Sequence, residues 1–351
     1  MIMFNTTRRR ASFREKTVVV TGASAGIGRA VAARFARAGA RLGLIAREQT
    51  ALTEIKSELE TLGVQVCTVA ADAADAQALF DAAEKFEREL GPIAVWVNAA
   101  MVTVFSPVVK TTPEEFRRVM EVTYLGFVNG TLAALKHMQP RNEGSIIQIG
   151  SALAYRGIPL QSAYCGAKFA IRGFTEALRA ELLHDKCQVT VSMIQLPGIN
   201  TPQFEWARTH VEYQPRPVAP VLQPSVPAEA AFKAASEGLD EYWIGNTASL
   251  LILGNMIFPR LMARYLAKTA YRGQQTDEPV SASRPDNLFS PAHRYHRTNG
   301  RFSSEARISA PIYPAGVARM AVLFGGTALT IALGYVFGRR DRPRLTNERR
   351  F

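Results

Sequence analysis

The chain has 351 residues, of which 47% are hydrophobic, and a formal net charge of +12. This length suits one large domain with an extension, or two domains. Three scattered cysteines, Cys67, Cys165 and Cys187, lack the spacing of a disulfide framework or a metal site, so a reducing compartment and no metal are expected.

The positive charge is concentrated at the two ends of the chain. Residues 1–16 carry +4 and residues 260–351 carry +10, which leaves −2 for residues 17–259. A nucleic-acid-binding protein more often places basic residues on a folded face among aromatic residues, so no nucleic-acid partner is expected. Basic ends beside apolar segments favour contact with anionic lipid. Residues 1–15 lack the apolar core of a secretory signal and are predicted to be a basic lead-in.

The first predicted element is a strand followed by a glycine-rich turn. Lys16–Thr21 is a β-branched run typical of a buried strand, and a helical pattern covers Arg29–Ala38. Between them, Gly22 permits a tight turn, Gly26 admits a pyrophosphate close to the backbone, and Gly28 lets helix and strand pack closely. This order predicts a dinucleotide site with its phosphates at the helix N-terminus. A turn without a ligand is the alternative.

The second predicted strand indicates which dinucleotide binds. Arg41–Ala46 is followed by Arg47 rather than by the acid that usually binds the ribose 2′-hydroxyl of NAD, although Glu48 comes next. An arginine here suits a 2′-phosphate, and Arg29 could assist it. The sequence therefore favours NADP(H) over NAD(H), with an ordinary loop arginine as the alternative.

Helical and strand patterns then alternate along the chain. The predicted helices are Glu48–Leu62, Asp75–Leu90, Pro113–Met138 (with Thr112 as N-cap) and Ala163–His184. The predicted strands are Val64–Ala70, Ile93–Asn98, Ser145–Ser151, Val189–Gln195 and Asp240–Ile244. Such alternation predicts an α/β fold, a doubly wound parallel sheet with a seven-stranded core.

A candidate catalytic group lies at the fifth strand and the helix after it. Tyr164 and Lys168 are four residues apart, which places them on one face of a helix, and Ser151 lies thirteen residues before the tyrosine. A nearby ammonium should lower the pKa of the Tyr164 phenol, so that it can exchange a proton with an alcohol or carbonyl. The Ser151 hydroxyl could orient the same oxygen. A surface Tyr–Lys pair is the alternative.

Residues 15–245 resemble the short-chain dehydrogenase/reductase family. The family's T-G-x-x-x-G-x-G motif corresponds to the turn at Thr21–Gly28, and its serine followed by Y-x-x-x-K corresponds to Ser151, Tyr164 and Lys168. The resemblance implies a Rossmann-type fold and reversible hydride transfer between NADP(H) and a carbonyl or secondary alcohol. It also implies a homo-oligomer. These implications are expectations for the structure.

The resemblance also assigns residues to the cofactor. Asp72 would lie beside the adenine, unless it caps a helix, and Pro197, Gly198 and Thr201 would cover the nicotinamide. The full expected cofactor-binding set is Gly22, Ser24, Gly26, Ile27, Gly28, Arg47, Asp72, Asn98, Tyr164, Lys168, Pro197, Gly198 and Thr201.

Two positions depart from the family pattern. The family's N-N-A-G stretch is Asn98–Met101 here, with its second Asn and its Gly replaced. The family's catalytic asparagine, three residues before a glycine, is Thr123 before Gly126. A threonine hydroxyl lacks the paired donor and acceptor of an amide, so the proton relay is in question, although turnover is still expected with Thr123 or a water filling in. The alternative function is a membrane-associated NADP(H)-binding protein with little or no turnover.

The remaining segments bear on substrate and location. The Pro-rich residues 202–227 occupy the family's substrate-lid position, and their apolar side chains suggest a lipophilic substrate, although a linker would look similar. Residues 246–315 are predicted to be an amphipathic and irregular extension, and residues 339–351 a basic tail. Residues 316–338 are a candidate membrane-associated helix, because Met320–Phe337 has no charge. The expected location is cytoplasmic, with membrane contact through 316–338, where a docking helix is the alternative.

Overall fold

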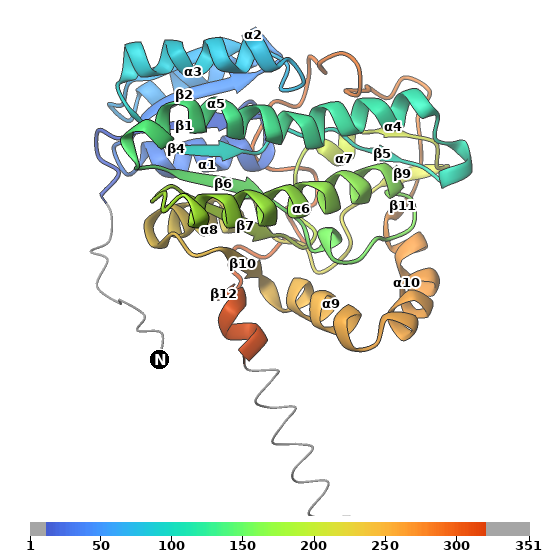
Figure 1. Ribbon diagram of the computed structural model, residues 1–351. Coiled ribbons are helices and arrows are strands. Elements are labelled where there is room, and N and C mark those ends of the chain that lie inside the picture. Colours follow the sequence, from blue (N-terminus) through green and yellow to red (C-terminus); the bar gives the residue numbers. More distant parts are fainter. Residues whose placement is uncertain (1–11, 321–351) are drawn as a thin grey trace, which may run out of the picture.

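The computed structural model describes residues 12–320, which are built around an eight-stranded sheet (Figure 1). Its strand order is β12-β10-β7-β6-β4-β1-β2-β3. The seven parallel strands are β1 (Thr17–Thr21), β2 (Arg41–Ala46), β3 (Val66–Ala70), β4 (Ile93–Asn98), β6 (Ser145–Ile149), β7 (Thr190–Gln195) and β10 (Glu241–Ile244). The chain order reverses between β1 and β4, where open parallel sheets bind ligands. The predicted doubly wound sheet is confirmed.

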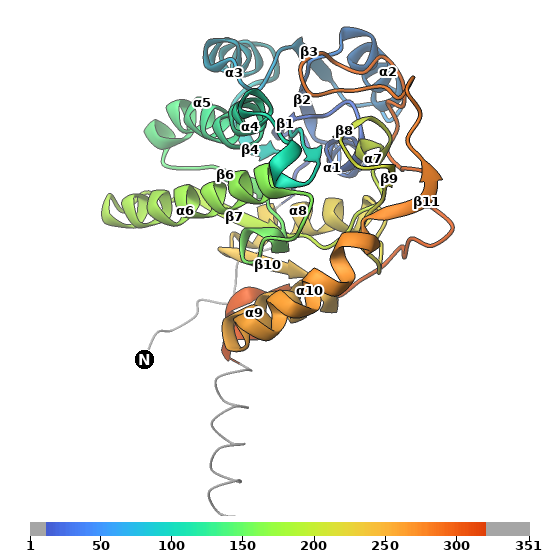
Figure 2. The same cartoon turned by 90° about the vertical axis from the view of Figure 1, so that its right-hand side faces the viewer.

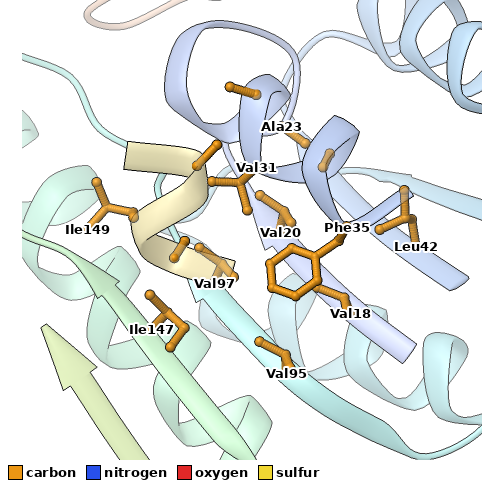
Figure 3. Close-up of a cluster of buried hydrophobic side chains, with 14 of the residues drawn as sticks. Val18, Val20, Ala23, Val31, Phe35, Leu42, Val95, Val97, Ile147 and Ile149 are labelled. Atoms are coloured by element: carbon orange, nitrogen blue, oxygen red, sulfur yellow. The ribbon is translucent and has the colours of Figure 1, made fainter. Parts of the chain in front are cut away.

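Helices cover both faces of this sheet. One face packs against α1 (Gly26–Ala36), α2 (Gln49–Glu60) and α8 (Ser225–Glu237), and the other against α3 (Ala76–Leu90), α5 (Gly126–Arg141) and α6 (Ser162–His184). Figure 3 shows the first core, where Val18 and Val20 of β1 meet Phe35 of α1. Val19 points to the opposite core. Because both faces are buried, β1 is apolar throughout rather than alternating.

The helix predicted over residues 113–138 is interrupted in its middle. It consists of α4 (Pro113–Val119), a π-helical segment η2 (Met120–Leu125) and α5. The predicted cap is present, since the Thr112 hydroxyl accepts a hydrogen bond from the Glu115 amide at 3.3 Å. A π-helical turn changes the facing of the side chains that follow it, and π-helical turns occur frequently at functional sites. Thr123 lies within this turn.

The extension after residue 245 packs onto the domain that contains the sheet. A helical hairpin, α9 (Gly245–Ile257) and α10 (Pro259–Gly273), lies below the sheet in Figure 1. Two strands then return to the domain: β11 (Gln275–Pro279) pairs with β9 (Tyr213–Pro215), and β12 (Ile312–Pro314) pairs antiparallel with β10. β12 is an eighth strand that the sequence analysis did not predict.

Smaller elements complete the region above the sheet's carboxyl edge. They are β5 (Val104–Phe105) paired with β8 (Arg208–Thr209), η1 (Val108–Lys110), η3 (Ala152–Ala154) and α7 (Gln203–Trp206).

Within residues 12–320, none of the helices combines the length and apolarity needed to cross a bilayer. The predicted lead-in lies mostly outside the described residues, as do residues 321–338 of the candidate helix and the basic tail.

A buried polar network joins β4 to α5 and β6. The Asn98 amide donates to Gln148 Oε1 at 3.0 Å and to Thr131 Oγ1 at 3.1 Å, and its oxygen accepts from Trp96 Nε1 at 2.9 Å. Helix α5 passes close above it at Gly130, where an added Cβ would lie 2.2 Å from Asn98 Oδ1. The close approach of helix and strand therefore requires glycine at position 130.

Gly130→Ala is expected to lower the free energy of unfolding by about 1–3 kcal/mol, because the added methyl overpacks a buried network. Denaturant unfolding measures the change. Gly173→Ala is the matched control: it also lies within a helix, but an added Cβ there has no heavy atom within 4 Å, so it should stabilise by about 0.5–1 kcal/mol. Equal effects of the two substitutions would contradict this account of Gly130.

Candidate active site

A single large cavity lies along the carboxyl ends of the parallel strands. Its volume is about 1050 Å³, comparable with the largest small-molecule sites. One end is bordered by the glycine turn, the middle by Ser151 and Tyr164, and the far end by α9 and α10. Apolar side chains form most of its wall. This position is the one expected for ligands of a doubly wound sheet.

The three predicted catalytic residues meet in the middle of this cavity. Ser151 follows β6, while Tyr164 and Lys168 lie on the first turns of α6, and all three line the wall. The Lys168 ammonium donates to the Ile149 carbonyl at 2.7 Å and lies 5.5 Å from the centre of the Tyr164 ring. The Ser151 hydroxyl also accepts from the Leu153 amide at 3.1 Å, which fixes its position at the start of η3.

Burial controls the proton affinities of this group. It raises the pKa of the Tyr164 hydroxyl above its usual value, and hydrogen bonding with Ser151 offsets part of that rise. It lowers the pKa of Lys168 from 10.5 to about 7, because the ammonium is 2% exposed and loses hydration. The expectation of a lowered Tyr164 pKa is not met in this geometry.

Thr123 is close to the site but does not face the cavity. Its hydroxyl donates to the Val102 carbonyl at 2.8 Å and accepts from the Val102 amide at 3.0 Å, and the side chain is fully buried. Both hydrogen-bonding capacities are therefore directed to the loop after β4. This contact holds the loop against η2, and the hydroxyl has no remaining donor for a proton relay.

The glycine turn has the shape of a phosphate cradle. Gly22 and Gly26 have φ values of 69° and 55°, which favour glycine. A Cβ on Gly28 would lie 2.2 Å from the Gly22 carbonyl, so only glycine permits this packing. No acidic side chain lies in the first turn of α1, and Ala25 at its N-cap provides no side-chain acceptor. Ser24 and Ile27 also line the cavity here.

Arg47 provides a buried cation at the end of β2. Its Nη2 donates to the Asn287 carbonyl at 2.6 Å, whereas its Nη1 is buried with no hydrogen-bond partner among residues 12–320. Burial lowers the pKa of Arg47, and the nearby Asp72 raises it in part. Arg29 is already engaged, because its Nη2 contacts Glu58 at 2.5 Å and its Nη1 donates to the His296 carbonyl at 2.8 Å. Arg47 is therefore better placed than Arg29 to receive a further anion.

Residues 286–297, here called the strap, cross the cofactor end of the cavity. Their carbonyls accept hydrogen bonds from the guanidinium groups of Arg29, Arg47 and Arg118. The Gly26 amide donates to the Arg297 carbonyl at 3.0 Å. Figures 1 and 2 show this orange segment beside α2, far from α10 where it originates. Sequence reasoning missed the strap, because its polar composition resembles that of a solvated loop.

The other predicted cofactor residues divide into two groups. Asp72, Pro197, Gly198 and Thr201 line the cavity, with Asp72 paired to Arg118 and accepting from the Ala74 amide at 3.0 Å. The Asn98 side chain lies behind the cavity, in the network that joins β4 to α5 and β6. The two altered residues after it, Ala99 and Met101, do line the cavity.

Comparisons with known proteins agree with this geometry. Residues 16–211 match the family described as short chain dehydrogenase. The Uncharacterized oxidoreductase YxnA of Bacillus subtilis is 33% identical over 79% of this chain and 78% of its own length. The Putative oxidoreductase SadH of Mycobacterium tuberculosis is 31% identical over 74% of this chain and 98% of its own.

Solved structures give the same assignment. A metagenomic short-chain oxidoreductase in complex with NADP has a TM-score of 0.56 and 25% identity, covering 66% of this chain and 96% of its own. An NAD⁺-bound xylitol dehydrogenase has a TM-score of 0.52 and 26% identity, covering 54% and 72%. Similar proteins thus bind either nicotinamide cofactor. This chain belongs to the short-chain dehydrogenase/reductase family of oxidoreductases.

Proposed function

We propose that this oxidoreductase uses NADP(H) to interconvert a carbonyl group and a secondary alcohol on a lipophilic substrate. The observation that carries the proposal is the convergence of Ser151, Tyr164 and Lys168 on one wall of a largely apolar cavity that also contains the glycine cradle. The bound nicotinamide would supply or accept the hydride. The protein's own side chains would align the reactants and manage the proton.

The roles of the three side chains follow from their surroundings. Ser151 would orient the substrate oxygen. Tyr164 would give that oxygen a proton during carbonyl reduction, because its raised pKa keeps the phenol protonated and an alkoxide is much more basic than a phenolate. Lys168, fixed by the Ile149 carbonyl, would hold the ribose and sit beneath the tyrosine.

The residues present fit NADP(H) better than NAD(H). The Nη1 of Arg47, which has no hydrogen-bond partner among residues 12–320, would donate to the 2′-phosphate of NADP(H). NAD(H) offers no such phosphate, so this donor would stay without a partner. The amide groups at the start of α1 would receive the pyrophosphate. Asp72 would lie near the adenine, with Arg118 holding its carboxylate in place.

The substrate would be apolar over much of its length. Phe204 and Trp206, from the predicted lid, line the cavity, and Leu251, Met262 and Leu266 line its far end. Burying such a wall against an apolar substrate would favour binding by about 25 cal/mol per Å² of apolar surface. Membrane contact through residues 316–338 and homo-oligomer formation also remain proposals. Only residues 316–320 of that segment are described.

Tyr164→Phe should reduce turnover by about 10²–10⁴-fold, the usual contribution of general acid–base catalysis, while NADPH binding is kept. Loss of NADPH absorbance with a panel of ketones, aldehydes and quinones measures turnover, and NADPH fluorescence measures binding. Tyr213→Phe, at an exposed tyrosine on β9, is the matched control and should match the wild type. Tight NADPH binding with no turnover by the wild type across the panel would instead support a binding protein.

Arg47→Met should weaken NADPH binding about 10–100-fold more than it weakens NADH binding, because a charge-assisted contact to the 2′-phosphate is worth about 1.5–3 kcal/mol. Fluorescence titration with each cofactor tests this. Arg118→Met removes a different contact to the strap, so it should affect the two cofactors to the same extent. An equal loss for both cofactors in Arg47→Met would contradict the assignment of Arg47.

Lys168 should make folding stability depend on pH. Its folded pKa of about 7 lies below the ordinary 10.5, so between these values the unfolded chain binds the extra proton and stability rises with pH. From pH 7 to 9, the unfolding free energy of the wild type minus that of Lys168→Met should increase by about 2 kcal/mol. Denaturant unfolding at each pH measures it. A difference that is flat or falls would show that the buried amine stays charged.

A further inference from the structure

The turn between α9 and α10 exposes a group of large apolar side chains. The exposed fraction is 59% for Met256, 54% for Ile257, 60% for Phe258 and 64% for Leu261. We call these four residues the hairpin tip. They lie close together in the chain, at the turn of the α9–α10 hairpin that Figures 1 and 2 show at the edge of the molecule, so four exposed apolar side chains are grouped at this turn. Continuous exposed apolar surfaces mark interaction sites, unlike single exposed residues.

Basic residues flank the hairpin tip along α10. Arg260, Arg264, Lys268 and Arg272 recur every fourth position, so they follow one side of the helix. Residues 245–273 contain no Asp or Glu. An apolar surface beside a basic stripe complements a bilayer with anionic headgroups, where apolar side chains enter the acyl region and cations stay at the surface. A second copy of the same hairpin would bring like charges together.

The cavity opens at this hairpin. Among the described residues that line the cavity, those that are also exposed lie on α9 and α10, apart from Ala219. The exposed lining residues on these two helices are Leu250, Tyr265, Thr269, Arg272 and Gly273. The mouth therefore lies along α9 and α10, the two helices whose turn carries the hairpin tip, while Ser151 and Tyr164 line a deeper part of the cavity.

The chain end that the structure describes lies at the same edge of the molecule. Residues 315–320 are helical and pack beside α9, with Ala318 against the cluster that contains Ile252. Arg319 fixes this segment by contacts of 2.5 Å to Glu241 and 2.8 Å to the Tyr155 hydroxyl. Val317 and Met320 remain exposed. Apolar surface on the hairpin is thus continued by apolar surface on a second segment.

We propose that the hairpin tip inserts into the surface of an anionic lipid bilayer, and that a lipophilic substrate passes from the bilayer into the cavity between α9 and α10. The substrate part of this inference rests on the proposed function. The docking part does not, since it follows from the apolar tip and the basic stripe.

Vesicle sedimentation of the full chain tests the docking. Binding to vesicles of phosphatidylcholine with phosphatidylglycerol should exceed binding to phosphatidylcholine alone about tenfold or more, because each basic residue adds to the attraction. The combined change of Met256, Ile257, Phe258 and Leu261 to Ser should weaken vesicle binding at least hundredfold. Leu183→Ser, at a 78% exposed leucine on the end of α6, is the control and should bind like the wild type.

Three results would overturn the docking. The first is vesicle binding by the hairpin-tip variant that equals that of the wild type. The second is equal binding of the wild type to neutral and anionic vesicles. The third is a change of oligomeric state in the variant with unchanged vesicle binding, which would indicate a second copy as the partner. Thermal melting and NADPH titration confirm that the variant is folded. These measurements need no substrate, so they stand even if reductase activity is absent.

Substrate entry has its own test once a substrate from the panel is known. With substrate embedded in vesicles, the hairpin-tip variant should show a KM raised at least tenfold. With the same substrate in detergent micelles or free in water, its kcat should equal that of the wild type. An equal KM for both proteins with embedded substrate would overturn entry from the bilayer while leaving the proposed carbonyl chemistry intact.

Discussion

The active site depends on one buried amine. Lys168 is held at 2.7 Å from the Ile149 carbonyl, the last residue of β6, and is almost entirely removed from water. This contact joins the start of α6 to the end of β6. Because Ser151 follows that strand and Tyr164 lies one helical turn before Lys168, the same contact brings all three side chains to one wall. The cost of burying the amine appears as its lowered pKa.

The cofactor end of the cavity is enclosed by a segment that comes from late in the chain. The strap offers backbone carbonyls to three arginines that extend from α1, β2 and α4. An arginine has five N–H donors, so Arg47 can hold the strap through Nη2 while its buried Nη1 has no hydrogen-bond partner among residues 12–320. The same residues therefore contribute to the fold and to the recognition of an anionic cofactor.

The two ends of the cavity differ in chemistry. The glycine turn and Arg47 provide amides and a cation, which suit phosphates, while the hairpin end provides leucine, methionine and tyrosine. Tyr164 lies between them. A cavity that is polar and anion-binding at one end and apolar and open at the other is consistent with a charged cofactor meeting a lipophilic substrate. The exposed hairpin tip places the apolar end next to the surface that a lipid would occupy.

The sheet, the glycine turn and the grouping of Ser151, Tyr164 and Lys168 could be predicted from the sequence. These features are local: β-branched runs form buried strands, glycine spacing dictates the turn, and the four-residue interval of Tyr164 and Lys168 fixes their shared face. The remaining features depend on contacts that form only when distant segments come together in the fold. The Asn98 amide donates a hydrogen bond to Gln148, fifty residues away in the chain. The Thr123 hydroxyl donates one to Val102, twenty-one residues away. The eighth strand, the strap and the pKa of Tyr164 likewise arise from contacts between distant segments and from burial, neither of which leaves a periodic pattern in the chain.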